Sequence, residues 1–102
     1  MYSEETARSS GTKSFSGEEL TEMQKKMLSD LGDEIASAQE YIDFKRQSTD
    51  EVDKQFFCSM AEDEYNHAYF LKERLEEYGV EIPEEYSKEL EDLKHHVSLF
   101  HY

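Results

Sequence analysis

The chain has 102 residues, 36% of them hydrophobic, and a net charge of −14, so it has room for one small domain. The negative charge argues against partners that need Lys/Arg patches, namely nucleic acid and anionic membrane surfaces. It suits a protein that attracts cations. Scarce Gly and Pro among many helix-forming residues predict an all-α fold. We expect no secretory signal or membrane span, since no apolar run approaches ~20 residues. A single cysteine, Cys58, is typical of the reducing cytoplasm.

The first fifteen residues are polar and aperiodic, so we expect residues 1–15 to form a flexible tail. A first helix is expected from near Gly17 to Arg46 or Gln47, with Ser16 and Glu19 as a capping box. Apolar residues then recur every three or four positions, which is typical of one stripe of an amphipathic helix. These residues are Leu20, Met23, Met27, Leu28, Leu31, Ile35, Ala38, Tyr41 and Ile42.

A second helix is expected after a very short link, with Ser48 and Glu51 as its capping box and Gly79 just past its end. Its apolar stripe comprises Val52, Phe56, Phe57, Met60, Ala61, Ala68, Leu71, Leu75 and Tyr78. So short a link predicts that the two helices form an antiparallel hairpin over residues 16–79.

Residues 80–102 are expected to form a short C-terminal helix and a tail, with Pro83 in the first turn. Its apolar residues are Tyr86, Leu90, Leu93 and Val97. Three histidines near the end, His95, His96 and His101, are potential metal ligands. Exposure to solvent without a metal is the simpler interpretation of all three.

Three ionisable residues fall within the apolar stripes, given that an α-helix turns about 100° per residue. Glu34 lies inside the stripe of the first helix, while Glu40 lies on the opposite face. Glu64 and His67 lie inside the stripe of the second helix. The sequence therefore predicts that two carboxylates and an imidazole meet on the seam of the hairpin.

A buried ionised carboxylate is costly unless it is paired or bound to a metal. One interpretation is a neutral or hydrogen-bonded group, such as a Glu64–His67 pair or a Tyr41 hydroxyl serving a glutamate. The other is a metal site, because Glu together with Glu-x-x-His on bundle helices is the ligand set of di-iron carboxylate proteins. Oxygen and imidazole ligands suit Fe or Mn.

The chain supplies half of such a site. A di-iron carboxylate centre takes about four Glu and two His from four helices, whereas this hairpin offers Glu34, Glu64 and His67 from two. A symmetric homodimer would complete both the ligand set and a ferritin-like four-helix bundle. We therefore expect an interfacial di-iron site, with Mn as an alternative metal, whose assembly is linked to metal binding.

Residues 28–78 resemble the encapsulated ferritins, half-bundle relatives of rubrerythrin. The resemblance rests on Glu34 with Tyr41 seven residues later, the turn Ser48-Thr49-Asp50, and Glu64-x-x-His67 thirty residues after Glu34. It implies that Glu34, Glu64 and His67 are the metal ligands and catalytic residues. It also implies that Tyr41 hydrogen-bonds beside the site and that Asp33 belongs to a metal entry path.

The same resemblance implies a ferroxidase that oxidises Fe²⁺ with O₂ for iron storage or detoxification. It further implies a decameric ring of five dimers inside a cytoplasmic encapsulin shell, whose protein would be a partner. Two rival functions use the same residues differently. One is a peroxide-reducing site like that of rubrerythrin or Mn-catalase, and the other is a non-enzymatic acidic helical interaction module.

Overall fold

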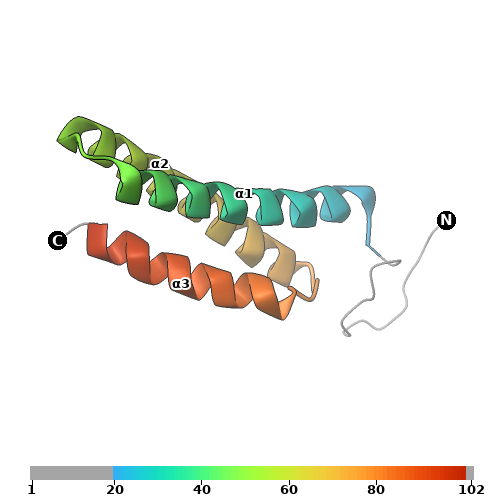
Figure 1. The fold of residues 1–102 in the computed structure, drawn as a ribbon. Coiled ribbons are helices and arrows are strands. Elements are labelled where there is room, and N and C mark those ends of the chain that lie inside the picture. Colours follow the sequence, from blue (N-terminus) through green and yellow to red (C-terminus); the bar gives the residue numbers. More distant parts are fainter. Residues whose placement is uncertain (1–19, 101–102) are drawn as a thin grey trace.

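The computed structural model describes residues 20–100, and all regular structure within them is helical. Helix α1 spans Glu22–Gln47, α2 spans Glu51–Glu77, and α3 spans Glu84–Phe100. Figure 1 shows α1 and α2 as an antiparallel hairpin, with the shorter α3 lying along it. The predicted all-α hairpin with a C-terminal helix is confirmed. The expected tail, residues 1–15, lies outside the described residues, as do the predicted capping box of Ser16 and Glu19 and His101.

Helix α1 begins later than predicted. Thr21 is its N-cap, and its hydroxyl accepts a hydrogen bond from the backbone N–H of Gln24 at 3.0 Å, while the Gln24 side chain accepts one from the N–H of Thr21 at 3.1 Å. This reciprocal pair is a capping box. The expected start near Gly17 is wrong, because Leu20 and Thr21 are not helical. The predicted end, at Gln47, is confirmed.

Asp50, and not Ser48, caps the start of α2. The Asp50 carboxylate accepts a hydrogen bond from the backbone N–H of Val52 at 2.7 Å. Ser48 instead ends α1, and its hydroxyl donates to the carbonyl of Phe44 at 2.8 Å. The predicted Ser48–Glu51 capping box is therefore wrong. Ser48 and Asp50 are both able to cap a helix, and Asp50 caps α2 because its carboxylate lies nearer the helix start.

Helix α2 ends where the position of Gly79 in the sequence predicts. Tyr78 is its C-cap, and Gly79 follows with φ 81°, a left-handed conformation that costs glycine little. The carbonyl of Pro83 accepts the first backbone hydrogen bonds of α3, from Tyr86 and Ser87. Pro83 thus precedes the first helical residue and is not part of the first turn.

The hydrophobic core lies along the hairpin seam and under α3. Each fully buried leucine there contributes about 1.5–3 kcal/mol to folding. Its buried members are Leu31, Ile35, Ala38, Ile42, Ala61, Ala68, Leu75, Val80, Leu90, Leu93 and Val97. Several residues of the predicted stripes are instead exposed: Met23, Val52, Phe56 and Tyr78.

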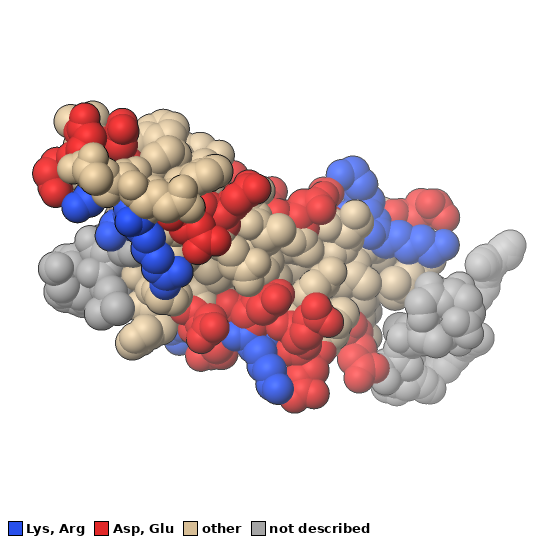
Figure 2. All heavy atoms as spheres, in the orientation of Figure 1, with Lys and Arg blue, Asp and Glu red and all other residues tan. Residues whose placement is uncertain are grey.

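Helix α3 packs on one face of the hairpin through a close approach at Gly32. A methyl group built on Gly32 would lie 2.5 Å from the hydroxyl oxygen of Tyr86, so a larger residue there would force the Tyr86 ring to move. Figure 2 shows acidic side chains over both the hairpin and α3, with few Lys or Arg among them. None of the helices within residues 20–100 has the length and apolar character needed to cross a membrane.

Candidate metal centre

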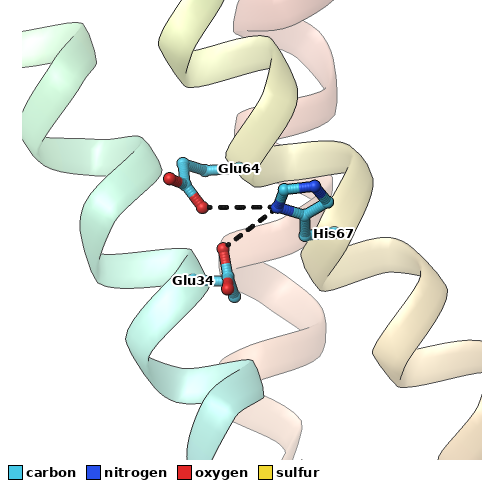
Figure 3. Close-up of side chains that lie close together, drawn as sticks. All are labelled: Glu34, Glu64 and His67. Atoms are coloured by element: carbon cyan, nitrogen blue, oxygen red, sulfur yellow. Dashed lines mark ion pairs between the residues drawn. The ribbon is translucent and has the colours of Figure 1, made fainter.

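Glu34, Glu64 and His67 converge midway along the hairpin. Glu34 comes from α1, whereas Glu64 and His67 come from consecutive turns of α2. His67 Nδ1 lies 3.6 Å from Glu34 Oε1 and 3.7 Å from Glu64 Oε1. Figure 3 shows both carboxylates turned toward this nitrogen. The three predicted site residues are thus brought together by one chain.

The cluster lies on the side of the hairpin opposite α3. In Figure 3 the three side chains stand in front of α1 and α2, with α3 behind them. Helical geometry agrees, because Gly32, which contacts α3, lies about 160° around α1 from Glu34. We call this side the open face of the hairpin, since no described element covers it.

Burial differs among the three side chains. The exposed fraction is 28% for Glu34 and 21% for Glu64, but 65% for His67. The expectation that all three face the core is therefore wrong for His67. Its position on α2 is about 100° from that of Ala68, which is buried, so it lies at the open edge of the seam.

Glu34 carries the clearest sign of an incomplete site. Its Oε1 atom is buried and has no hydrogen-bond partner among the described residues. A buried acceptor without a partner costs about 1–3 kcal/mol, so native proteins usually supply one. The unpaired oxygen points at the same position as Glu64 and His67, where a cation would satisfy it.

A hydrogen bond that protonated Glu34 would share with the Glu64 carboxylate, together with burial and the negative charge of Glu64, raises the pKa of Glu34 to about 7, against the opposing effect of His67. Two carboxylates this close repel each other when both are ionised. A bound cation would remove that repulsion, whereas without one a shared proton is the alternative.

The interpretation as a simple hydrogen-bonded Glu64–His67 pair does not fit the distances. Both imidazole-to-carboxylate separations exceed those of a hydrogen bond. The ligand atoms of the three residues lie within 4.8 Å of one another. Ligands at 2.0–2.2 Å on opposite sides of an ion are at most about 4.4 Å apart, so sub-ångström shifts would bring all three into contact with one metal. The donor set therefore fits a bound metal ion.

The other residues singled out in the sequence do not join this cluster. The Tyr41 ring stacks on Phe57, with centroids 6.2 Å apart, so its role beside the metal stays a prediction. Asp33 is exposed, and its role in metal entry is likewise untested. His95 and His96 lie against each other, and neither belongs to a group of three potential ligands within residues 20–100.

Two features of the structure are not predicted by the sequence. The first is Phe70, a large apolar residue outside the predicted stripe, whose side chain is 65% exposed one turn after His67. A period of 3.5 residues would have placed it beside Met60 and His67. The second feature is a cavity of about 240 Å³ between α2 and α3, on the side away from the cluster. Its lining residues are Tyr65, Tyr69, Lys72, Ser87, Leu90, Glu91 and Lys94.

Comparisons with known proteins give no family assignment. No protein-family model matches the chain, and neither a curated protein nor a solved structure is significantly similar to it. Residues 20–100 thus form three helices and carry a candidate metal-binding group of two glutamates and one histidine.

Proposed function

We propose that this protein is a ferroxidase, which oxidises Fe²⁺ to Fe³⁺ with O₂ at a di-iron site formed by two copies of the chain. One observation carries the proposal: Glu34, Glu64 and His67 present their ligand atoms within 4.8 Å of one another on the open face of a helical hairpin. This is the ligand type and helical placement of half a di-iron carboxylate centre.

The need for a second copy follows from counting ligands. Three protein ligands do not fill the coordination of two irons, whereas six from two chains do. The exposure of His67 is consistent with an incomplete site, because a histidine ligand is normally enclosed by its neighbours. Large apolar side chains also remain exposed on the same helix, such as Phe56 at 54% and Phe70 at 65%. Exposed apolar surface of this kind marks interaction sites.

Each residue then has a role in the proposed reaction. Glu34 and Glu64 would hold the ferrous ions through their carboxylates and His67 through its imidazole, and the iron would supply the electrons that reduce O₂. The negative charge of the two carboxylates favours the ferric product, and the acidic surface draws cations toward the protein. Two Fe²⁺ would give one electron each to O₂, and two protons would complete H₂O₂, so two Fe²⁺ would be oxidised for each O₂.

The wider context of the proposal comes from the resemblance to encapsulated ferritins. It comprises a decameric ring, an encapsulin shell as partner and iron storage or detoxification as the purpose. The same resemblance leaves Tyr41 and Asp33 as candidates for tuning the site and admitting iron. All of these are proposals that follow the di-iron assignment and fail with it.

The proposal is tested by adding Fe²⁺ to the metal-free protein in air and following the ferric absorbance. We expect rapid oxidation that His67→Ala abolishes and His95→Ala leaves intact, since His95 is exposed on another helix. Glu64→Gln and the exposed Glu40→Gln form a second matched pair. Equal rates in parent and His67→Ala would refute the ferroxidase.

The same variants separate the rival functions. Faster turnover with H₂O₂ than with O₂, lost in His67→Ala, would identify a peroxide-reducing site. Metal analysis of protein purified without chelator gives the simplest discrimination, because we expect about one iron per chain from two irons per dimer. Absence of iron and manganese would favour an acidic interaction module.

A further inference from the structure

Helix α2 carries a second stripe of residues beside the one that packs on α1. Its members follow each other at alternating spacings of four and three, which is the repeat of a coiled-coil seam. We call it the outer seam of α2: Phe56, Met60, Asp63, His67, Phe70 and Arg74. Phe56, Asp63, His67 and Phe70 are exposed, whereas Met60 and Arg74 are half-buried.

The outer seam is complementary to itself when reversed. Its members are placed symmetrically about Tyr65, which lies on another face of the helix. Asp63 and His67 are two residues away from this midpoint, Met60 and Phe70 are five away, and Phe56 and Arg74 are nine away. Reversal therefore sets acid against imidazole, apolar against apolar, and an aromatic ring against a guanidinium.

Neighbouring registers of the antiparallel α2 pair place less compatible side chains opposite each other. Sliding one α2 helix along its antiparallel partner by seven residues places Met60 opposite a carboxylate in either direction. The carboxylate is that of Glu77 in one direction and that of Asp63 in the other. Each places a charged group against an apolar surface at a desolvated seam. One register among those compatible with the repeat is thus favoured by the side chains alone.

The metal ligands select the same register independently. Glu64 and His67 lie on either side of Tyr65, so an antiparallel pair centred there sets the two clusters at the same level. A slide of seven residues would separate the clusters by about 10 Å along the helix axis, too far for a shared di-iron site.

We propose that the outer seam of α2 binds the outer seam of a second copy of this chain, antiparallel and centred on Tyr65. This rests on the proposed dimeric metal site and adds its register. Met60 packs on the partner's Phe70, and the partner's Phe56 lies opposite Arg74, whose guanidinium pairs with Glu77 and lies over the Tyr78 ring of its own chain. Asp63 accepts a hydrogen bond from Nε2 of the partner's His67, which leaves Nδ1 directed at Glu34 and Glu64. Asp63 is thereby a positioning residue for a ligand that its own chain leaves exposed.

Cysteine cross-linking tests the register, in a Cys58→Ser background that removes the native thiol. The double variant Met60→Cys/Phe70→Cys is oxidised with and without Mn²⁺, and covalent dimer is measured on a non-reducing gel. We expect formation at least tenfold faster than in Phe56→Cys/Phe70→Cys. The control changes two residues of the same seam, but they are about 6 Å out of register along the axis, beyond the reach of a disulfide.

Other outcomes would overturn the proposal. Faster cross-linking of the control, or equal rates, would refute the register. Cross-linking of Met60→Cys alone would indicate parallel helices, because each Met60 would then meet its own copy. If sedimentation analysis detects no dimer, both the register and the proposed dimer are refuted. A cross-linked dimer that does not oxidise iron would keep the interface and refute only the ferroxidase. Circular dichroism confirms that every variant keeps its helices.

Discussion

At the scale of single residues, Glu34 is both a half-buried carboxyl group of the hairpin seam and a proposed metal ligand. Its position along α1 places the carboxylate beside Glu64, where a shared hydrogen bond, burial and like charge raise the pKa of Glu34 and so oppose its ionisation. A metal ion reverses that balance because it interacts favourably with both carboxylates. The same residue should therefore control how both metal affinity and stability depend on pH.

Metal affinity should weaken in acid as protons compete for Glu34. With the pKa of Glu34 near 7, the site is largely deprotonated at pH 8 and protonated at pH 6. We expect the Kd for Mn²⁺, measured by calorimetry, to rise by roughly tenfold for one competing proton between these pH values. A Kd that stays constant from pH 8 to pH 6 would contradict the assigned ligand.

Stability of the metal-free protein should show the opposite sign for this group. A pKa raised from 4.5 to about 7 means that the folded chain binds more protons than the unfolded chain between those values, so stability falls as pH rises through this window. Glu34→Gln removes the titration. We expect the variant to gain about 1 kcal/mol relative to the parent from pH 5 to pH 8, after allowing for solvent screening, in urea unfolding with chelator present. A constant difference would show that Glu34 is not perturbed.

At the scale of elements, the packing of α3 sets which face of the hairpin stays open. Tyr86 fits against Gly32 because that position of α1 has no Cβ atom. A glycine inside a helix costs about 0.5–1 kcal/mol relative to alanine, so its use here indicates that the close approach matters. By docking on this side, α3 leaves Glu34, Glu64 and His67 uncovered on the other.

Gly32→Ala should destabilise the fold despite alanine's higher helix propensity. The added methyl would meet the Tyr86 hydroxyl at 2.5 Å, and the strain should exceed the propensity gain by about 1–2 kcal/mol. In a Tyr86→Phe background the hydroxyl is absent, so the same substitution should cost less. Denaturant unfolding of the four proteins gives the coupling energy, and additivity would argue against this contact.

At the scale of the whole molecule, the two faces of the hairpin differ in what covers them. One face is closed by α3, and its residues Leu90 and Leu93 are buried. The open face combines the candidate metal site with exposed apolar side chains. A small acidic chain keeps such a surface only at a cost in solubility, which fits a function in self-association.

Phe70→Glu should therefore weaken self-association without unfolding the chain. The substitution places a carboxylate on the open face, where the partner copy is proposed to pack, and we expect at least a tenfold weaker dimer by sedimentation. Gln55→Glu adds the same charge at an exposed position of α2 outside the outer seam and should leave the dimer unchanged. Equal effects of the two substitutions would indicate a general charge effect instead of an interface.

The sequence by itself determined the helices and the members of the site. Apolar spacing places Leu31, Ile35 and Ala38 on one stripe, and Glu34, Glu64 and His67 follow from helical phase, because both depend on local geometry alone. Capping was less predictable, since Ser48 and Asp50 compete within one link and small differences in distance choose between them. The tertiary structure decided which face α3 covers, and hence that His67 is exposed and Glu34 Oε1 is left without a partner. Those features depend on contacts between residues distant in the chain, such as Gly32 and Tyr86, which no local pattern encodes.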